Sequence, residues 1–276
     1  MNSYRKTITA FLLLLIILMH SASAKTDMQK PDLEREKRMA AEVEDSILDG
    51  DVVFLKTDEN ANENSDHEFM AIDTKPDGDE KLIKGAVVIL HGRGFHPDWE
   101  DAIQPLRIQL AEHGWRTLSL QMPVLEKAAK YYDYVPLFPL AGPRIEAGIQ
   151  YLNDQGTKNI ILLAHSCGAH MAMDWISTKG DGMINAYIGV GMGATDYKQS
   201  MKQPFPLADM KVPVLDIYGA DEYPAVIRMA PDRKTAMEKA GNKKSKQIIV
   251  PDANHYFTDK GNAIVSEVVK WLDTLK

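Results

Sequence analysis

From Gly85 to the end of the chain, short apolar segments alternate with segments of helical pattern, and this alternation constrains the fold most strongly. The apolar segments, such as Ala86–Leu90 and Asn159–Ala164, are nearly continuous runs without a polar residue at every second position. Strands of this kind are buried on both faces, as in parallel sheets covered by helices. The order therefore predicts an α/β fold with a mostly parallel sheet and helices on both faces.

Each expected element of this region has bounds that can be read from the chain. The strands span Ala86–Leu90, Arg116–Leu120, Asn159–Ala164, Ile184–Val190, Val214–Tyr218 and Gln247–Val250. The helices span Trp99–Glu112, Pro143–Asn153, Cys167–Thr178, Ala225–Ala240 with a break at Pro231, and Asn262–Leu275. Two further strands, Asp51–Lys56 and Glu68–Thr74, predict an antiparallel hairpin around the polar loop Asp58–Asp66. We expect one domain, residues 49–276, preceded by a tether and an amphipathic helix in residues 25–48.

The stretch Ile160–Ala169 reads as a buried strand that enters a helix through a tight turn at Ser166. It resembles the nucleophile elbow, GxSxG, in which the residues two before and two after the serine must be small. Those positions hold Ala164 and Gly168, so one glycine of the pattern is replaced by alanine. The stretch predicts Ser166 as a nucleophile, and the alternative is a serine that caps the helix.

A serine hydroxyl needs a general base to act as a nucleophile at neutral pH. His255 follows the last expected strand, in the turn before the closing helix. We predict His255 as the base; the alternative is a histidine in a surface loop.

The base in turn needs a carboxylate to orient it. Asp221 is the first choice, because it lies just past the end of the strand Val214–Tyr218. Glu222 would replace it after a shift of one residue. Asp216 ranks lower because it lies inside the strand, and Asp252 because it is too close in sequence to His255.

A glycine-rich turn, Leu90–Phe95, ends the first strand of the alternating region. Such a turn points backbone amides at a nucleophile, and the residue after the nucleophile supplies a second amide. We predict an oxyanion hole from the amides of Cys167 and Arg93, with Gly94 as the other candidate for the second donor. Taken alone, the turn would be an ordinary connection from a strand to a helix.

Two side chains at this site have alternative interpretations. The guanidinium of Arg93 would bind an acidic group of a substrate or form a surface ion pair with Asp98 or Glu100. Cys167 is interpreted as a small buried residue beside the nucleophile.

Residues 121–142 form a longer connection that contains Tyr131, Tyr132 and Tyr134. Loops at the carboxyl edge of a parallel sheet line the substrate crevice. We expect a lid or a wall for substrate here; the alternatives are a rigid surface loop and a docking patch.

Together, the HGRGF, AHSCG, YGADE and ANH stretches make the chain from about Asp51 to Lys276 resemble the α/β-hydrolase superfamily. The stretch from His91 to Trp99 and the tyrosine-containing connection resemble an uncharacterised bacterial family of exported hydrolase-like proteins. The resemblance implies an eight-stranded sheet and acyl transfer through Ser166 on a small-molecule or lipid-like acyl substrate. A serine peptidase or amidase, and a non-catalytic envelope protein on the same fold, are the alternatives.

The amino terminus predicts a secretory signal peptide over residues 1–24, with Arg5 and Lys6, an apolar run from Ile8 to Met19 and the ending Ala22-Ser23-Ala24. The alternative is an uncleaved membrane anchor. Cleavage would remove two basic residues and no acidic one, so the formal net charge would change from −7 to −9. This charge argues against nucleic acid as a partner. We expect an exported protein without a membrane span after cleavage, and the family resemblance favours the periplasm over the medium. No motif for a metal or cofactor is present in the sequence, so none is expected.

Overall fold

The computed structural model describes residues 30–57, 68–78, 83–196 and 199–275. The predicted signal peptide, residues 25–29 of the predicted tether and the predicted loop of residues 58–66 lie outside the described residues. No described helix is both long and apolar enough to cross a membrane.

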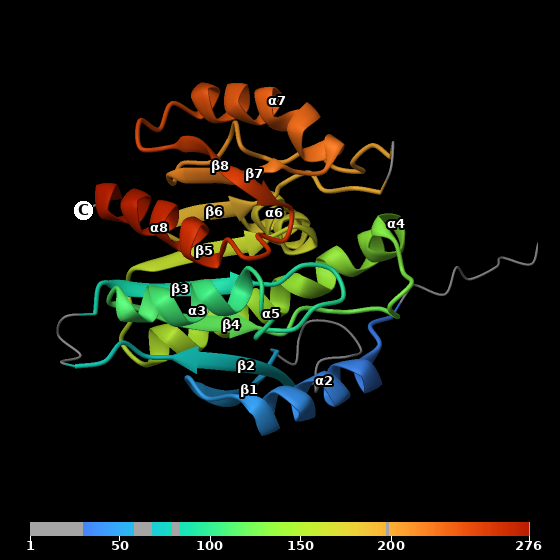
Figure 1. Ribbon diagram of the computed structural model, residues 1–276, viewed down its shortest axis with the longest axis vertical. Helices are drawn as coiled ribbons and strands as arrows, with labels where there is room; N and C mark the ends of the chain where they lie inside the picture. The colour runs from blue at the N-terminus through green and yellow to red at the C-terminus, as the bar shows by residue number, and fades with distance from the viewer. Residues whose placement is uncertain (1–29, 58–67, 79–82, 197–198, 276) are drawn as a thin grey trace, which may run out of the picture.

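An eight-stranded sheet forms the centre of the molecule, with strand order β1-β2-β4-β3-β5-β6-β7-β8 (Figure 1). The pairs β1–β2 and β2–β4 are antiparallel, and every other neighbouring pair is parallel. The mostly parallel sheet predicted from the sequence is therefore confirmed. The strands are β1 (Asp51–Lys56), β2 (Glu68–Thr74), β3 (Gly85–Leu90), β4 (Trp115–Leu120), β5 (Ile160–His165), β6 (Ala186–Val190), β7 (Val214–Asp221) and β8 (Lys246–Asn254).

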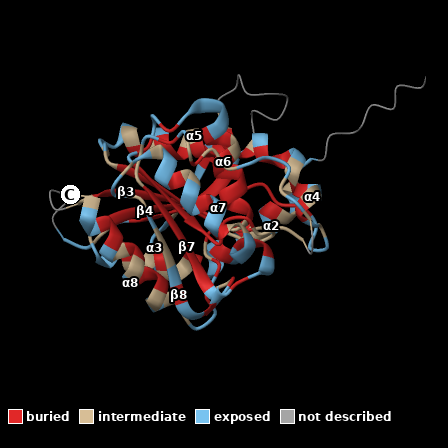
Figure 2. Ribbon diagram, turned by 90° about the horizontal axis from the view of Figure 1, so that it is seen from above, coloured by how far each residue is buried: buried red, intermediate tan, exposed pale blue. Residues whose placement is uncertain are grey.

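Helices cover both faces of the sheet, so that the central strands are buried between exposed outer surfaces (Figure 2). The helices are α2 (Leu33–Ser46), α3 (Ile103–Glu112), α4 (Tyr131–Tyr134), α5 (Phe138–Asp154), α6 (Cys167–Lys179), α7 (Pro224–Ala240) and α8 (Gly261–Leu272), with the 3₁₀ turns η2 (Val135–Leu137) and η3 (Asp273–Leu275).

The side chains of β3 show why a continuous apolar strand suits this position. Val88 and Leu90 belong to the core under α5 and α6, whereas Val87 and Ile89 belong to the core under α3 and α8. Successive side chains of a strand point to opposite faces, so a strand with a core on each side needs apolar residues throughout.

Two helices differ from the predicted bounds because of prolines. Helix α5 begins at Phe138 rather than at Pro143, with Pro139 in its first turn, where a missing amide costs no helical hydrogen bond. Helix α7 continues through Pro231 without ending. Pro231 and Ile227, four residues before it, are both exposed, so water can reach the carbonyl that loses its partner.

Candidate active site

Ser166 lies in the sharp turn that joins β5 to α6. Its backbone has φ 54° and ψ −117°, a conformation that L-residues rarely adopt. The turn is tight enough that a Cβ on Gly168 would lie 2.5 Å from the carbonyl oxygen of His91. Among the described residues, the Ser166 side chain makes no hydrogen bond that caps α6, which disfavours the interpretation as a helix cap. The turn has the shape expected of a nucleophile elbow.

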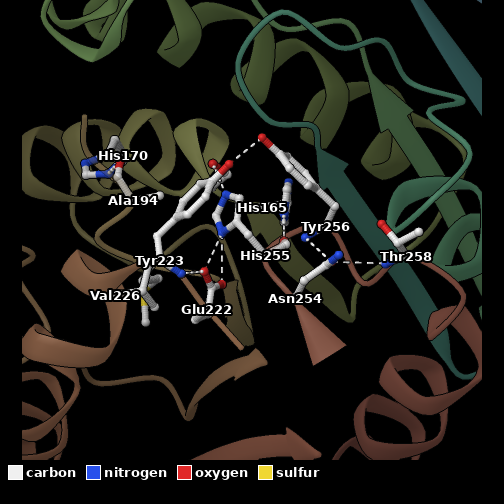
Figure 3. A network of polar contacts seen from close by, with 12 residues as sticks. His165, His170, Ala194, Glu222, Tyr223, Val226, Asn254, His255, Tyr256 and Thr258 are labelled. Atoms are coloured by element: carbon white, nitrogen blue, oxygen red, sulfur yellow. Dashed lines mark hydrogen bonds and ion pairs between the residues drawn. The ribbon is translucent and has the colours of Figure 1, made fainter. Parts of the chain in front are cut away.

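A line of hydrogen bonds joins Ser166 to His255 and Glu222. Figure 3 shows its part between His255 and Glu222. The Ser166 Oγ lies 2.8 Å from His255 Nε2, and His255 Nδ1 lies 2.7 Å from Glu222 Oε2. With a neutral imidazole protonated at Nδ1, this nitrogen donates to the carboxylate and Nε2 accepts from the serine hydroxyl. The side chains of His255 and Glu222 are buried.

The structure corrects the choice of Asp221 as the acid, because the carboxylate on His255 belongs to Glu222. A register irregularity between Gly219 and Asp221 interrupts the pairing of β7 with β8. Past it Asp221 is exposed, whereas Glu222 is buried. A bulge changes which residues face the interior. The carboxylate beside His255 is therefore that of Glu222, the alternative one residue later.

Asp216 belongs to a different buried group, as its position inside the strand suggests. Its Oδ2 accepts from Arg233 Nε at 2.8 Å and from Gln247 Nε2 at 2.7 Å. Burial raises the pKa of Asp216, and the Arg233 charge opposes this shift. This carboxylate pairs with an arginine of α7 rather than with a histidine.

Two tyrosines that the sequence reasoning missed enclose the His255 ring (Figure 3). The Tyr223 ring stacks on His255 with centroids 4.4 Å apart, and the Tyr256 ring meets it edge-on at 5.2 Å. Their hydroxyl oxygens are 2.6 Å apart, and burial raises the pKa of Tyr223. Each tyrosine directly follows a residue of the hydrogen-bonded line, which is the signal that could have identified it.

His165, another residue that the sequence reasoning missed, forms a hydrogen bond with the backbone of His255. Its Nε2 donates to the backbone carbonyl of His255 over 2.9 Å. His165 is fully buried, and burial lowers its pKa to about 3. A neutral ring therefore fixes the backbone that carries the candidate base.

The glycine-rich turn after β3 is held by His91. His91 Nε2 accepts from the backbone amide of Met122 at 2.9 Å, and Nδ1 donates to the carbonyl of Gly92 at 2.8 Å. Burial lowers the pKa of His91 to about 3, so its neutral form is the one that makes both bonds.

The predicted oxyanion-hole residues Cys167, Arg93 and Gly94 line one pocket together with Ser166 and His255. Cys167 is the first residue of α6, where backbone amides have no partner inside the helix. Within the described part of the chain, we find no acceptor for the backbone amides of Cys167, Arg93 and Gly94. The amide of Cys167 and that of either Arg93 or Gly94 are thus the candidates for binding an oxyanion. The Cys167 thiol is buried, which raises its pKa to about 12, as expected for a residue that packs rather than reacts.

The Arg93 side chain forms an ion pair, but not with either predicted partner. Its Nη1 lies 3.0 Å from Asp196 Oδ1, and the other oxygen of Asp196 accepts from the backbone amide of Tyr131. Asp98 pairs instead with Arg107. The Asp196 carboxylate therefore links the glycine-rich turn to the start of α4.

The tyrosine-containing connection is helical from Tyr131 onward rather than a loop up to residue 142. Tyr131 and Tyr134 are buried and line the pocket, which has a volume of about 260 Å³. The Tyr134 hydroxyl accepts from the amide of Leu125 at 2.8 Å. Tyr132 lies outside the pocket, and its hydroxyl donates to the carbonyl of Ser200 at 3.1 Å. The segment thus supplies two of the three predicted tyrosines as part of the wall.

Helix α2, expected to lie on the domain, also reaches the site. Arg35 donates from Nη2 to the Gly94 carbonyl at 2.9 Å and from Nη1 to the Leu125 carbonyl, and it lines the pocket. The neighbouring Glu36 is buried against Arg144, with Nη2 and Oε2 3.0 Å apart. Helix α2 therefore contributes the Arg35 side chain to the lining of the candidate site.

No group of three or more histidine, cysteine, aspartate or glutamate residues placed to hold a metal occurs in the described ranges. The side chains at the site are those of acid–base and nucleophilic chemistry: a hydroxyl, an imidazole and a carboxylate in hydrogen-bond sequence. The arrangement can deprotonate Ser166 and stabilise the imidazolium that results.

Comparisons with known proteins place the chain in a family and a fold. The model of a family described as "Protein of unknown function (DUF3530)" matches residues 8–134 and 141–274. No match was found among curated proteins.

Solved structures similar to the chain include the esterase Pf2001 of Pyrococcus furiosus, with a TM-score of 0.61, 17% identity and coverage of 84% of this chain and 95% of that one. They also include Est1E from Butyrivibrio proteoclasticus, with a TM-score of 0.60, 15% identity and coverage of 82% and 98%. A serine hydrolase homologue from Coxiella burnetii matches with a TM-score of 0.58, 16% identity and coverage of 81% and 98%. These similarities confirm the predicted α/β-hydrolase fold.

Proposed function

The chain belongs to the DUF3530 family of proteins of unknown function, and we propose that it is a serine hydrolase that cleaves a carboxylic ester or a related acyl bond. The observation that carries the proposal is the hydrogen-bonded line from Glu222 through His255 to Ser166, with the serine in a strained turn. A structural serine needs neither feature, whereas the serine of a nucleophile elbow has the strained turn and an activated serine needs the base.

In the first half of the reaction, Ser166 Oγ attacks the acyl carbon while its proton moves to His255 Nε2. The tetrahedral intermediate collapses, the bond to the leaving alkoxide breaks, and His255 returns the proton to that oxygen. Glu222 remains ionised and stabilises the imidazolium formed in between, at a buried contact of 2.7 Å.

In the second half, water replaces the leaving group. His255 removes a proton from the water, whose oxygen attacks the acyl carbon of the Ser166 ester, and the proton then passes to Ser166 Oγ as the acid departs. The amides of Cys167 and Arg93 would hold the oxyanion in both halves, since removal of one such donor typically costs about 10²–10³ in kcat.

Labelling by a fluorophosphonate probe tests the proposal on the mature protein. We expect the wild type to be labelled, and the Ser166→Ala and His255→Ala variants to be unlabelled although folded. A folded wild type that takes no label would contradict the proposal and favour the envelope-binding alternative. Comparing p-nitrophenyl esters with the matching p-nitroanilides then separates an esterase from an amidase.

We further propose that the protein is exported to the periplasm, with residues 1–24 removed as a signal peptide. The support is the basic start, the apolar run and the Ala-x-Ala ending of that segment. Amino-terminal sequencing of protein recovered from the periplasmic fraction should begin at Lys25. A chain that retains Met1 in the membrane fraction would contradict the proposal.

A further inference from the structure

The pocket beside Ser166 is lined mainly by cations among its charged side chains. Arg35, Arg93, Lys127 and Lys130 line it, against a single carboxylate from Glu126. This balance opposes that of the whole chain, whose formal net charge is −7. A local excess of positive charge at the mouth of a pocket raises the concentration of anions there.

Within the described part of the chain, only one of these cations pairs with a carboxylate. Arg93 pairs with Asp196, whereas Arg35 donates to two neutral backbone carbonyls and so keeps its charge uncompensated. Lys127 and Lys130 are exposed, and no carboxylate of the described residues lies within ion-pair distance of either ammonium.

Two acidic groups beside Lys127 and Lys130 in the sequence do not cancel this excess. Asp133 accepts the backbone amide of Lys130 at the start of α4 and does not line the pocket. Glu126 offsets one charge of the three left by Arg35, Lys127 and Lys130. The lining therefore keeps a net charge of about two positive units, which an anionic ligand would complement.

The pocket is also small. Its volume of about 260 Å³ lies below the range of about 300–1,000 Å³ that is typical of pockets for drug-sized ligands. A small polar acyl compound fits this space better than a long hydrocarbon chain does.

Resting on the proposed hydrolase function, we propose that the substrate is a small acyl compound that carries an anionic group, a carboxylate or a phosphate. The anion lies among Arg35, Lys127 and Lys130 while the acyl carbon lies at Ser166. The cations then contribute to substrate binding and selection, and the hydrogen-bonded line performs the chemistry.

Calorimetric binding to the Ser166→Ala protein tests the anion without turnover. The ligands are adipate, n-butyl phosphate and the neutral analogue adipamide. We expect at least one anion to bind more than about tenfold tighter than adipamide, with the difference reduced in about 0.5 M NaCl. Tighter binding of n-butyl phosphate would identify a phosphate substrate, tighter binding of adipate a carboxylate. Equal affinity for adipamide and both anions would overturn the proposal.

A matched pair of double variants, each made in the Ser166→Ala protein, assigns the effect to the pocket. Lys127→Gln with Lys130→Gln should weaken binding of the preferred anion by about 25-fold, since one exposed charge pair contributes about fivefold. Lys239→Gln with Lys243→Gln removes two exposed lysines outside the pocket and should change it less than about twofold. Equal losses in the two pairs would refute a local site.

The two proposals fail separately in these experiments. A labelled wild type without preference for anions would leave the hydrolase standing and remove the anionic substrate. Anion binding in a wild type that takes no fluorophosphonate label would leave the anion site and remove the hydrolase. With both present, the p-nitrophenyl monoester of adipic acid should be cleaved with a higher kcat/KM than the corresponding ester of adipamic acid.

Discussion

Replacing Glu222 by glutamine removes one negative charge from the site while keeping nearly the same shape. The Glu222 carboxylate lies 2.7 Å from His255 Nδ1 and is fully buried. For two charges about 4 Å apart, with an effective dielectric constant of about 20, the lost attraction to the imidazolium is about 4 kcal/mol. Each 1.36 kcal/mol corresponds to about a tenfold change in rate, so we expect kcat to fall by about 10³, and by up to about 10⁴ if the amide also favours the wrong tautomer.

The matched control is Asp221→Asn, the same change one residue earlier. Asp221 is exposed, and its pairing partner in the sheet is Asn254. We expect its kcat to stay within about threefold of the wild type, since exposed charges contribute little across water. The assay is the initial rate on a p-nitrophenyl ester, together with the rate of fluorophosphonate labelling and the thermal midpoint of each variant.

The reasoning would be refuted by the reverse ranking, with Asp221→Asn inactive and Glu222→Gln active. It would also fail if both folded variants kept the rate of the wild type, because the buried carboxylate would then do nothing for the imidazolium.

Three further predictions concern the turn, the packing and the stability of the site. Gly191→Ala should lower kcat by about 10² or more, because its Cβ would lie 2.8 Å from Glu222 Oε1 and 2.9 Å from His255 Cε1 and would displace the pair. A variant with the rate of the wild type, whose crystal structure shows Glu222 and His255 in place, would contradict this. Ser166→Gly should be more stable than Ser166→Ala, by about 1 kcal/mol in the free energy of unfolding, since glycine adopts φ 54° without strain. Its thermal midpoint should therefore be higher. Equal thermal midpoints would show that the turn stores no backbone strain. The free energy of unfolding should fall as the pH drops below about 6.5, by on the order of 1–2 kcal/mol per buried histidine at about pH 5. The reason is that the unfolded chain binds protons that the folded chain excludes. A free energy of unfolding in urea that stays constant from about pH 7.5 to 5 would contradict this prediction. The histidines concerned are His91 and His165, with pKa values lowered to about 3, and His170, with a pKa lowered to about 4.

The fold was predictable from the sequence because its buried strands are continuous apolar runs that the sequence shows directly. The hairpin strands β1 and β2 match their predicted bounds, and β3 to β6 differ by one or two residues at their ends. Strand β8 runs four residues beyond Val250, where Pro251 and Asp252 indicated a turn. Pairing with the irregular end of β7 extends it as far as Asn254, and a tertiary interaction of this kind leaves no local signal.

The site was predictable where local geometry determines a residue's role. Ser166 and His255 follow the ends of strands, and the parallel topology brings those ends to one edge of the sheet. The acid was chosen wrongly because Asp221 and Glu222 differ by one position, and one bulge decides which side chain turns inward. The composition of β7 does not reveal this bulge, because the bulge depends on the pairing with β8, whose end the sequence did not predict.

Helix α2 shows why a sequence can locate the reaction and still miss part of the pocket. Its charged run, Leu33–Arg38, gives no local reason to separate Arg35 from Arg38, yet only Arg35 holds the carbonyls of Gly94 and Leu125. These contacts join residues 59 and 90 positions apart, and no periodicity in the helix records them. They join helix α2 to the domain that is predicted to begin at residue 49. Since Arg35 binds the carbonyl of Gly94 in the glycine-rich turn, a domain that began at residue 49 would keep the hydrogen-bonded line and lose part of what orients the proposed oxyanion hole.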